Sequence, residues 1–223
     1  MKIGLIGAGR LGLCLALLMD KAGYSVIASD VREDYIDGLQ QGEVITTEPL
    51  VGQYLESARR IEFTTDNLRV IEESDIIFTL VLTPSLENGS YDVSNVDDVV
   101  SDILKYGWDK DLSNKSLVIG CTTNPGDCDF FQDRLSETGI SVFYNPEFIA
   151  QGSIINDLQN ADMVLLGHSN GKDLDSVIKD IQNLYKKIQV TRAIVCSMSL
   201  KAAEITKIAV NCFLTTKISY ANM

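Results

Sequence analysis

Histidine and tryptophan are nearly absent from this chain of 223 residues, since each occurs once. The single histidine, His168, excludes a metal site built from several imidazoles and a relay of histidine side chains. The five cysteines form no CxxC pair and are odd in number, which argues against a zinc site or a disulfide framework. We therefore expect no bound metal and a location in the reducing cytoplasm.

Positive charge is also scarce, with 19 Lys and Arg against 31 Asp and Glu and a net charge of −12. This balance argues against a nucleic acid or an anionic membrane as the main partner. The apolar run from Ile3 to Met19 is interrupted by Arg10 and by glycines, so it is neither a membrane span nor a signal peptide. A hydrophobic content of 45% is enough for the core of a folded domain.

Short apolar runs alternate with amphipathic helical patterns along the chain. The expected strands are Lys2–Ile6, Ser25–Ser29, Ile61–Thr64, Asp75–Val81, Ser116–Cys121, Ile140–Tyr144, Met163–Gly167 and Ala193–Cys196. The expected helices are centred on 11–22, 35–41, 96–106, 128–138, 174–186 and 199–223. Apolar strands alternating with helices predict an α/β fold, a doubly wound, mostly parallel Rossmann-like sheet followed by a long C-terminal helix.

The last helical pattern, 199–223, stops without a glycine cap or a proline. We therefore expect the chain to be the front part of a longer protein. In this interpretation residues 1–198 form the dinucleotide-binding domain, and residues 199–223 begin a connecting and dimerisation helix.

Gly7, Gly9 and Gly12 form a GxGxxG motif between the first expected strand and the first expected helix. The first glycine permits a tight turn, the second lets a diphosphate approach the backbone, and the third lets helix and strand pack closely. Asp30 ends the second strand, where a carboxylate binds ribose hydroxyls and repels a 2′-phosphate. The combination predicts NAD rather than NADP. Arg32 is near enough to weaken this preference, although a solvated charge is the simpler interpretation.

Polar residues follow the carboxyl ends of the fourth and fifth expected strands, the edge where such sheets bind ligands. Thr83 and Thr122 are therefore candidates for contact with a cofactor. For Thr83 an ordinary turn stiffened by Pro84 is an equal alternative. Cys121 ends a buried apolar run without a nearby histidine, so we expect a core thiol rather than a nucleophile.

The segment 145–152, with the sequence NPEFIAQG, follows the sixth expected strand. It places Glu147 beside a proline and an aromatic residue at the mouth of the sheet, where a carboxyl group with a raised pKa could act as a general base. Capping of the following helix by Glu147 is an equal alternative, and the sequence leaves both open.

Glu204, Lys207 and Asn211 are spaced along the last helical pattern. Apolar flanking residues such as Ile205 and Phe213 predict that this helix is largely buried. Lys207 and Asn211 share one face and could together stabilise a developing oxyanion. The spacing of Glu204 and Lys207 fits a solvated ion pair as well.

These motifs, in this order, resemble the UDP-glucose/GDP-mannose dehydrogenase family of nucleotide-sugar 6-dehydrogenases from Lys2 to Asn222. Three further segments carry the resemblance: Glu48-Pro49-Leu50, Phe63-Thr64-Thr65-Asp66 and Lys217-Ile218-Ser219.

The resemblance implies oxidation of a sugar 6-hydroxyl to a carboxylate in two NAD-dependent steps, through a cysteine-bound thiohemiacetal and a thioester. The substrate would be a UDP-sugar, UDP-glucose first, or a GDP-sugar, and the chain would form a homodimer through its C-terminal helix. The implied cofactor-binding residues are Gly7, Gly9, Arg10, Leu11, Gly12, Asp30, Thr83, Thr122 and Gln151. The implied catalytic residues are Glu147, as the base in thioester hydrolysis, Lys207, Asn211 and Thr122. The implied substrate-binding residues are Glu147, Phe148, Ile149, Ala150, Gln151, Lys207 and Asn211.

The chain also departs from the family pattern. None of its five cysteines matches the family's nucleophile, and the family's nucleotide-binding domain has no counterpart here, so we expect these residues alone to be inactive. Gln151 stands where glutamate is usual, Arg10 replaces a common aromatic residue, Tyr35 stands where a basic residue is frequent, and Cys121 stands where serine is common.

Two other functions remain open. A β-hydroxyacid or 6-phosphogluconate-type dehydrogenase shares the Rossmann start and a buried lysine helix, but it lacks the Asn-Pro-Glu-Phe turn. A non-catalytic NAD-binding module is compatible with Gln151 and with the missing cysteine.

Overall fold

The computed structural model describes residues 1–169 and 174–223. Within them the strands are β1 Lys2–Ile6, β2 Ser25–Ser29, β3 Ile61–Thr64, β4 Ile76–Thr79, β5 Ser116–Ile119, β6 Ser141–Tyr144, β7 Met163–His168 and β8 Ile194–Ser199. The helices are α1 Arg10–Lys21, α2 Glu33–Gln40, α3 Val51–Ser57, α4 Asn67–Glu73, α5 Ser94–Gly107, α6 Asp127–Leu135, the 3-10 helix η1 Ser136–Thr138, α7 Ile154–Gln159, α8 Asp175–Ile188 and α9 Leu200–Ala221.

The strands form one sheet in the order β3-β2-β1-β4-β5-β6-β7-β8. Neighbouring strands run parallel except β6 and β7, which are antiparallel. All the expected strands are present, so the predicted doubly wound, mostly parallel sheet is confirmed. Its chain order reverses between β1 and β4, which is the position where ligands bind in open sheets of this kind.

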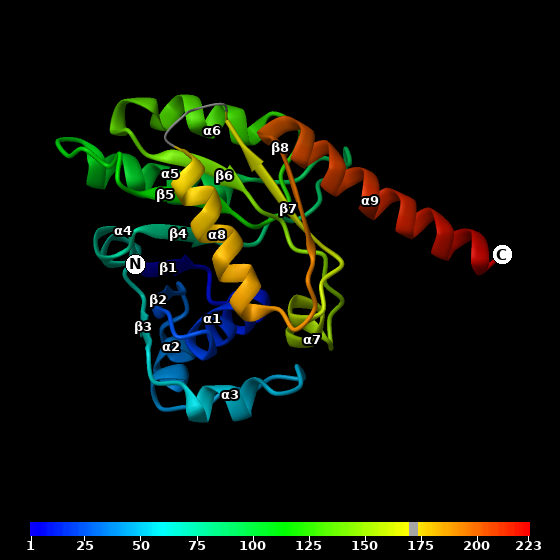
Figure 1. Ribbon diagram of the computed structural model, residues 1–223, viewed down its shortest axis with the longest axis horizontal. Coiled ribbons are helices and arrows are strands. Elements are labelled where there is room, and N and C mark those ends of the chain that lie inside the picture. Colours follow the sequence, from blue (N-terminus) through cyan, green and yellow to red (C-terminus); the bar gives the residue numbers. More distant parts are fainter. Residues whose placement is uncertain (170–173) are drawn as a thin grey trace.

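Helices cover both faces of the sheet (Figure 1). One apolar layer includes buried residues of α1, α3, α7 and α8, and the other includes buried residues of α4, α5, α6 and the start of α9. Alternate residues of the central strands face the two layers, as Leu5 and Phe78 face the first while Ile77 and Leu117 face the second. A central sheet buried on both sides explains why its strands are continuously apolar in sequence.

Three helices were not expected from the sequence: α3, α4 and α7, each with only six or seven residues. So short a helix shows too few turns for an apolar periodicity to emerge. A start signal was present for α4, because the Asp66 carboxylate accepts hydrogen bonds from the N–H groups of Leu68 and Arg69.

The long helix α9 corrects one expectation, because it is not largely buried. Its buried residues lie only in the first two turns, and the last of them is Lys207. Beyond that point Phe213 is 61% exposed and Tyr220 is 81% exposed, on a segment that projects away from the body (Figure 1). The apolar residues of this outer segment are exposed rather than buried. Neither α9 nor any other described helix has the length and apolarity needed to cross a membrane.

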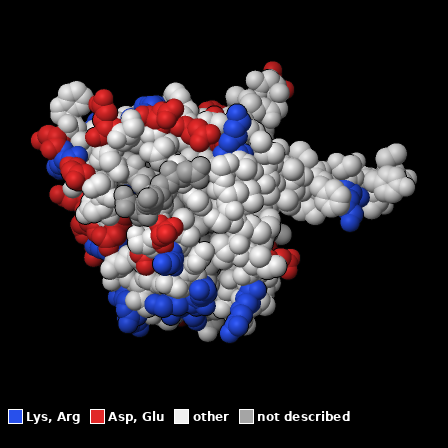
Figure 2. Space-filling view, turned by 45° about the horizontal axis from the view of Figure 1, so that its top comes forward, with Lys and Arg blue, Asp and Glu red and all other residues white. Residues whose placement is uncertain are grey.

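Charge is distributed unevenly over the surface shown in Figure 2. Asp and Glu are concentrated on the upper and left parts of this face, while several Lys and Arg side chains gather along its lower rim. The net charge of −12 is therefore not spread uniformly.

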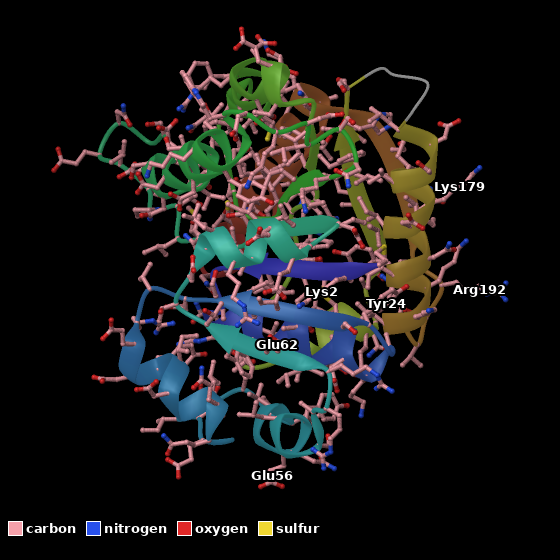
Figure 3. All side chains as sticks on the ribbon, turned by 90° about the vertical axis from the view of Figure 1, so that its left-hand side faces the viewer. Lys2, Tyr24, Glu56, Glu62, Lys179 and Arg192 are labelled. Atoms are coloured by element: carbon pink, nitrogen blue, oxygen red, sulfur yellow. The ribbon has the colours of Figure 1, made fainter. Side chains whose placement is uncertain are left out.

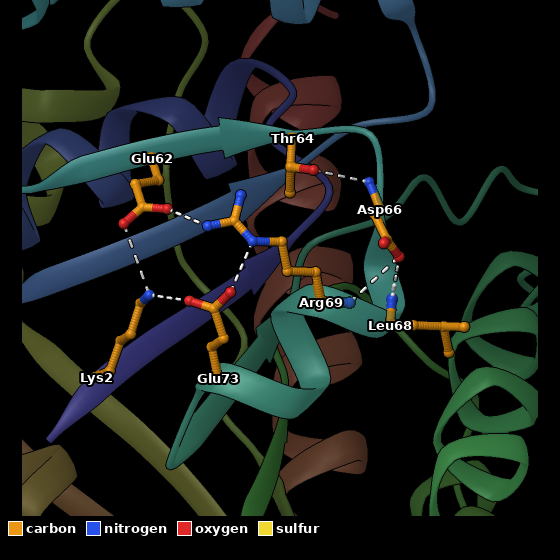
Figure 4. Close-up of polar contacts among 7 residues, drawn as sticks. All are labelled: Lys2, Glu62, Thr64, Asp66, Leu68, Arg69 and Glu73. Atoms are coloured by element: carbon orange, nitrogen blue, oxygen red, sulfur yellow. Dashed lines mark hydrogen bonds and ion pairs between the residues drawn. The ribbon is translucent and has the colours of Figure 1, made fainter.

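Four charged residues join β1, β3 and α4 near the beginning of the strands, on the side seen in Figure 3. Lys2 Nζ lies 2.5 Å from Glu73 Oε2 and 3.8 Å from Glu62 Oε1. The Arg69 guanidinium lies 2.5 Å from Glu62 and 2.6 Å from Glu73 (Figure 4). This ion-pair quartet supports the edge strand β3 at the end of the sheet opposite to the predicted site.

Candidate functional site

The loops that carry the predicted site residues lie together at one edge of the sheet. Backbone hydrogen bonds continue past the strand ends, from Leu80 N–H to the Ile6 carbonyl at 2.8 Å and from Asn145 N–H to the Ile119 carbonyl at 2.8 Å. The carboxyl ends of β1, β4, β5 and β6 are therefore level. Residues separated by more than a hundred positions are brought to the same edge of the sheet.

The glycine loop between β1 and α1 has the geometry that a diphosphate requires. Gly7 has a φ of +97°, and a Cβ there would lie 2.7 Å from the Leu80 carbonyl oxygen. A Cβ at Gly12 would lie 2.1 Å from the Gly7 oxygen, so both positions need glycine. Gly9 has no atom within 4 Å of a Cβ position, and as the N-cap of α1 it provides no side-chain cap. Open space in front of uncapped helix N–H groups fits the anionic part of NAD.

Asp30 follows β2, and its carboxylate is already paired. Arg32 approaches it with two nitrogens, Nε at 2.8 Å and Nη2 at 2.9 Å, and the guanidinium also lies 4.1 Å from the centre of the Tyr35 ring. The Arg32 side chain is 56% exposed, as expected of a solvated charge, and it is also paired with Asp30. Tyr35 in turn donates its hydroxyl to the Ala8 carbonyl at 2.9 Å, so this group supports the glycine loop.

Arg10 and Gln151, both predicted cofactor contacts, meet at this edge of the sheet. Arg10 Nη1 donates to Gln151 Oε1 at 2.7 Å. The contact holds a guanidinium at the start of α1, where Leu11 follows it half-buried. It also joins the glycine loop to the end of segment 145–152.

Thr83 and Thr122 lie half-buried in the loops after β4 and β5. In the part of the chain that the structure describes, neither hydroxyl has a hydrogen-bond partner, so both are free to meet a ligand. The first loop is secured by Asn95 Nδ2, which donates to the Leu82 carbonyl at 2.7 Å. Cys121 is buried, and burial raises the pKa of its thiol to about 12, so it is the core thiol that the sequence predicted.

Glu147 follows β6 and points its carboxyl group to the hydroxyl of Tyr185 on α8. Burial raises the pKa of Glu147 to about 7 from an ordinary 4.5, while the Tyr185 hydrogen bond and the Lys207 charge lower it. The alternative role as a helix cap is wrong, because α7 begins at Ile154 after its N-cap Ser153. A carboxyl group that changes protonation near neutral pH has the property of a general base.

Lys207 on α9 reaches the same loop through its ammonium group. Its Nζ donates to the Glu147 carbonyl oxygen at 2.6 Å and lies 4.3 Å from the centre of the Phe148 ring. Burial lowers the pKa of Lys207, and the charge of Glu147 opposes this effect. Asn211 lies one helical turn further along α9 and is half-buried.

Glu48, in the loop before α3, holds the other end of segment 145–152. Its buried carboxylate accepts hydrogen bonds from Gly152 N–H at 2.7 Å and Ile154 N–H at 3.2 Å. In the sequence, Glu48 stood out only through the resemblance. Two further predicted substrate contacts lie between these anchors, Ile149 half-buried and Ala150 exposed.

Glu204 on α9 does not form the expected ion pair with Lys207. Its fully buried carboxylate accepts hydrogen bonds from Thr123 Oγ1 at 2.8 Å, Gly126 N–H at 2.6 Å and Cys128 N–H at 2.9 Å. The two side chains therefore leave α9 toward different partners. The hydrogen bonds of Glu204 attach α9 to the beginning of α6. This attachment also fixes the position of Lys207, one turn further along α9.

Tyr185 is the main residue that the sequence analysis missed. It lies on the buried side of the amphipathic helix α8, where a tyrosine looks like any other core residue. No local pattern could have linked it to Glu147, which is 38 positions away.

No cluster of three or more His, Cys, Asp or Glu side chains in residues 1–169 and 174–223 could hold a metal ion.

The doubly wound sheet and its glycine loop define a dinucleotide-binding α/β domain. A family model described as "UDP-glucose/GDP-mannose dehydrogenase family, NAD binding domain" matches residues 1–189. The chain therefore belongs to the UDP-glucose/GDP-mannose dehydrogenase family and contains its NAD-binding domain.

Individual relatives agree with this assignment. A UDP-glucose 6-dehydrogenase of Rickettsia conorii is 31% identical over 227 residues, which cover 100% of this chain and 50% of the relative. Among solved structures, a GDP-mannose dehydrogenase from Pseudomonas aeruginosa matches with a TM-score of 0.88 and 26% identity, over 100% of this chain and 52% of the other. A UDP-glucose dehydrogenase from Pyrobaculum islandicum matches with a TM-score of 0.86 and 25% identity, over 99% and 51%. The chain thus spans about half the length of the curated relatives it matches.

Proposed function

We propose that this chain supplies the NAD-binding part of a nucleotide-sugar 6-dehydrogenase. The reaction would oxidise a UDP-sugar, UDP-glucose first, to the uronate in two NAD-dependent steps. The observation that carries the proposal is the meeting of Glu147 and Lys207 at the same sheet edge as the glycine loop. The printed activity of the Rickettsia conorii relative, UDP-glucose 6-dehydrogenase, supports the choice of sugar nucleotide.

In this proposal residues 1–198 form the cofactor domain and residues 199–223 begin the connecting helix. The segment Gly7–Gly12, with Arg10 and Leu11 in the first turn of α1, holds the diphosphate. Asp30 binds the adenosine ribose, and it must share its carboxylate with Arg32 or release it. Thr83, Thr122 and Gln151 line the nicotinamide side. NAD, when bound, supplies the acceptor for the hydride.

The catalytic groups would act on the sugar, beside the nicotinamide. Glu147 accepts a proton from water as a base, which its pKa of about 7 allows near neutral pH. Lys207 carries a positive charge in a partly desolvated position, where it stabilises negative charge on oxygen more strongly than it would in water. Asn211 and Thr122 would position the water. The backbone of Phe148, Ile149, Ala150 and Gln151 would contact the substrate.

We also propose a homodimer formed through α9 and a location in the cytoplasm. The outer part of α9 exposes Phe213, Leu214, Ile218 and Tyr220, each at least 50% accessible, and such a stripe favours association. A strictly monomeric profile in light scattering would count against the dimer. The five free cysteines are compatible with a reducing compartment.

Thermal unfolding with and without NAD tests the proposed cofactor site. NAD binds only the folded state, so at a hundredfold excess over Kd it should add about 2.7 kcal/mol to the free energy of unfolding. Asp30→Ala should remove most of the resulting rise in Tm, whereas Asp34→Ala, an exposed change in the first turn of α2, should leave it intact. Absence of any shift at millimolar NAD would refute the cofactor assignment.

A turnover assay separates the alternatives. With UDP-glucose and NAD we expect no NADH from these 223 residues, because none of the five cysteines matches the family's nucleophile. NADH formation from UDP-glucose would contradict this expectation. Formation from 6-phosphogluconate would favour a β-hydroxyacid-type dehydrogenase. A third outcome is that NAD raises Tm but a UDP-sugar gives no further rise in Tm, even when the C-terminal half of a full-length relative is added. The chain is then better described as a non-catalytic NAD-binding module.

A further inference from the structure

The hydroxyl of Tyr185 lies between two acceptors, the side chains of Asn145 and Glu147. Its oxygen is 2.5 Å from Asn145 Oδ1 and also within hydrogen-bonding distance of Glu147 Oε1. Asn145 Nδ2 donates to the Leu165 carbonyl at 2.9 Å, which fixes the amide so that its oxygen faces Tyr185. A phenol has one proton and can donate to only one of these oxygens at a time.

The three groups can be satisfied in two ways. When Glu147 is protonated, its own O–H donates to the Tyr185 oxygen and the Tyr185 O–H donates to Asn145. When Glu147 is ionised, the Tyr185 O–H turns and donates to the carboxylate instead. The first arrangement has a hydrogen bond at each contact, and the second gives the buried charge its donor at the expense of Asn145.

We propose that Tyr185 is a positioning residue whose hydroxyl turns between Asn145 and Glu147 as the Glu147 carboxyl group gains and loses a proton. The inference deepens the proposed function and rests on it, because it gives the proposed base a partner in both protonation states. The titratable groups that face Glu147 are Tyr185 from α8 and Lys207 from α9. Lys207 donates to the backbone carbonyl, so among described side chains Tyr185 alone hydrogen-bonds to the carboxyl group.

Such a partner matters because a buried carboxylate without a donor is strongly disfavoured. Burial raises the pKa of Glu147 to about 7, and the Tyr185 hydrogen bond lowers it, which keeps ionisation within reach at neutral pH. Burial raises the pKa of Tyr185 itself well above its ordinary value, so the hydroxyl keeps its proton and acts as a donor. Proton gain at Glu147 is then accompanied by rotation of one hydroxyl rather than by movement of the loop.

Titration of the Glu147 side-chain carboxyl by carbon-detected NMR, on the full 223-residue chain without NAD, tests the proposal. Tyr185→Phe keeps the ring and removes the donor, so the pKa of Glu147 should move upward by about one unit, the size of a charge-assisted hydrogen bond. Asn145→Ala removes the acceptor that only the protonated state uses, so the pKa should move downward. Tyr24→Phe is the matched control, because this ring lies beneath Lys187 on another part of the surface, and it should change nothing.

Opposite shifts in the two variants would support the turning hydroxyl, since a merely structural role gives no reason for opposite signs. An unchanged pKa in Tyr185→Phe, or an upward shift in Asn145→Ala, would overturn it. If Tyr185→Phe fails to fold, the direction of the Asn145→Ala shift decides alone. Because the titration needs neither NAD nor turnover, its outcome is independent of the thermal-shift test of the proposed function.

Discussion

Glu204, which is buried on α9, and Glu147, which is half-buried beside Lys207 of α9, differ in what surrounds the carboxyl group. Glu204 extends from α9 to the beginning of α6 and accepts hydrogen bonds from one hydroxyl and two backbone N–H groups. Glu147 lies after β6, where its carboxyl group has the Tyr185 hydroxyl as a donor and Lys207 binds its backbone instead.

The difference follows from the local backbone. A helix N-terminus offers N–H groups that lack partners within the helix, so it can hold a carboxylate with little help from side chains. The end of a buried strand offers no such row of donors, because its N–H groups point to neighbouring strands. One site therefore serves to attach α9, while the other keeps a carboxyl group whose charge is not fully compensated. Incomplete compensation is what permits proton exchange near neutral pH.

Replacement of Glu204 should give the largest loss of stability. In Glu204→Gln one carboxylate oxygen becomes an NH2 group that faces backbone N–H donors, so we expect a loss of about 3 kcal/mol in the free energy of unfolding. Urea unfolding measures it. Glu56→Gln, on the exposed surface of α3 (Figure 3), is the control and should be near neutral. A loss below about 1 kcal/mol would mean that the α6 attachment contributes little.

The same comparison explains which parts of the molecule were predictable from sequence. The strands and the glycine loop are encoded by neighbouring residues, and the predicted sheet and the need for glycine at Gly7 and Gly12 are confirmed. The spacing of Glu204 and Lys207, three positions apart, fits an ion pair, but Glu204 instead accepts a hydrogen bond from Thr123, which is 81 positions away. Local spacing on a helix carries no information about which other helix or loop packs against it.

The candidate site divides in the same way. Its position at the carboxyl edge and the choice of Glu147 as a candidate base followed from the order of the elements and from the family motifs. The contacts of Tyr185, Glu48 and Arg32 depend on how loops approach one another in space, and they could not be read from periodicity. The exposure of the outer half of α9 was obscured for another reason, since apolar residues there predict burial without saying what covers them.

Replacement of Glu147 should have the opposite sign to Glu204, and the effect should depend on pH. The folded pKa of about 7 lies above the ordinary 4.5, so the folded state binds the extra proton between these values. The stabilising contribution is complete below about pH 4.5 and is lost as pH rises through 7. Glu147→Gln should therefore be more stable than the parent by about 3 kcal/mol at pH 8 and nearly equal at pH 4.

Thermal or urea unfolding of both proteins between pH 4 and pH 8 gives the two curves. Glu56→Gln again serves as the control and should follow the parent at every pH. A difference that is constant across the range would show that Glu147 does not change its protonation state within it, and the distinction between the two glutamates would then disappear.

Glu48 provides an intermediate case with two backbone donors. Glu48→Gln should cost about 1 kcal/mol, less than Glu204→Gln, because fewer hydrogen bonds to the carboxylate are disturbed. The change should also loosen segment 145–152 and weaken NAD binding through the Arg10–Gln151 contact. Urea unfolding and an NAD titration measure the two effects. A loss as large as that of Glu204→Gln would show that the number of hydrogen-bond donors does not determine the order of the stability losses.

The exposed quartet around Glu73 should show the smallest effect. Glu73 has two cationic partners, Lys2 and Arg69, and both hydrogen bonds lower the pKa of its carboxyl group (Figure 4). It nevertheless faces solvent, where water and salt compete for the same charges and an ion pair contributes little. Glu73→Gln should leave the urea midpoint unchanged at physiological salt, with any difference appearing only at low ionic strength. A loss comparable to that of Glu48→Gln would mean that the number of partners, rather than burial, sets the importance of a glutamate in this fold.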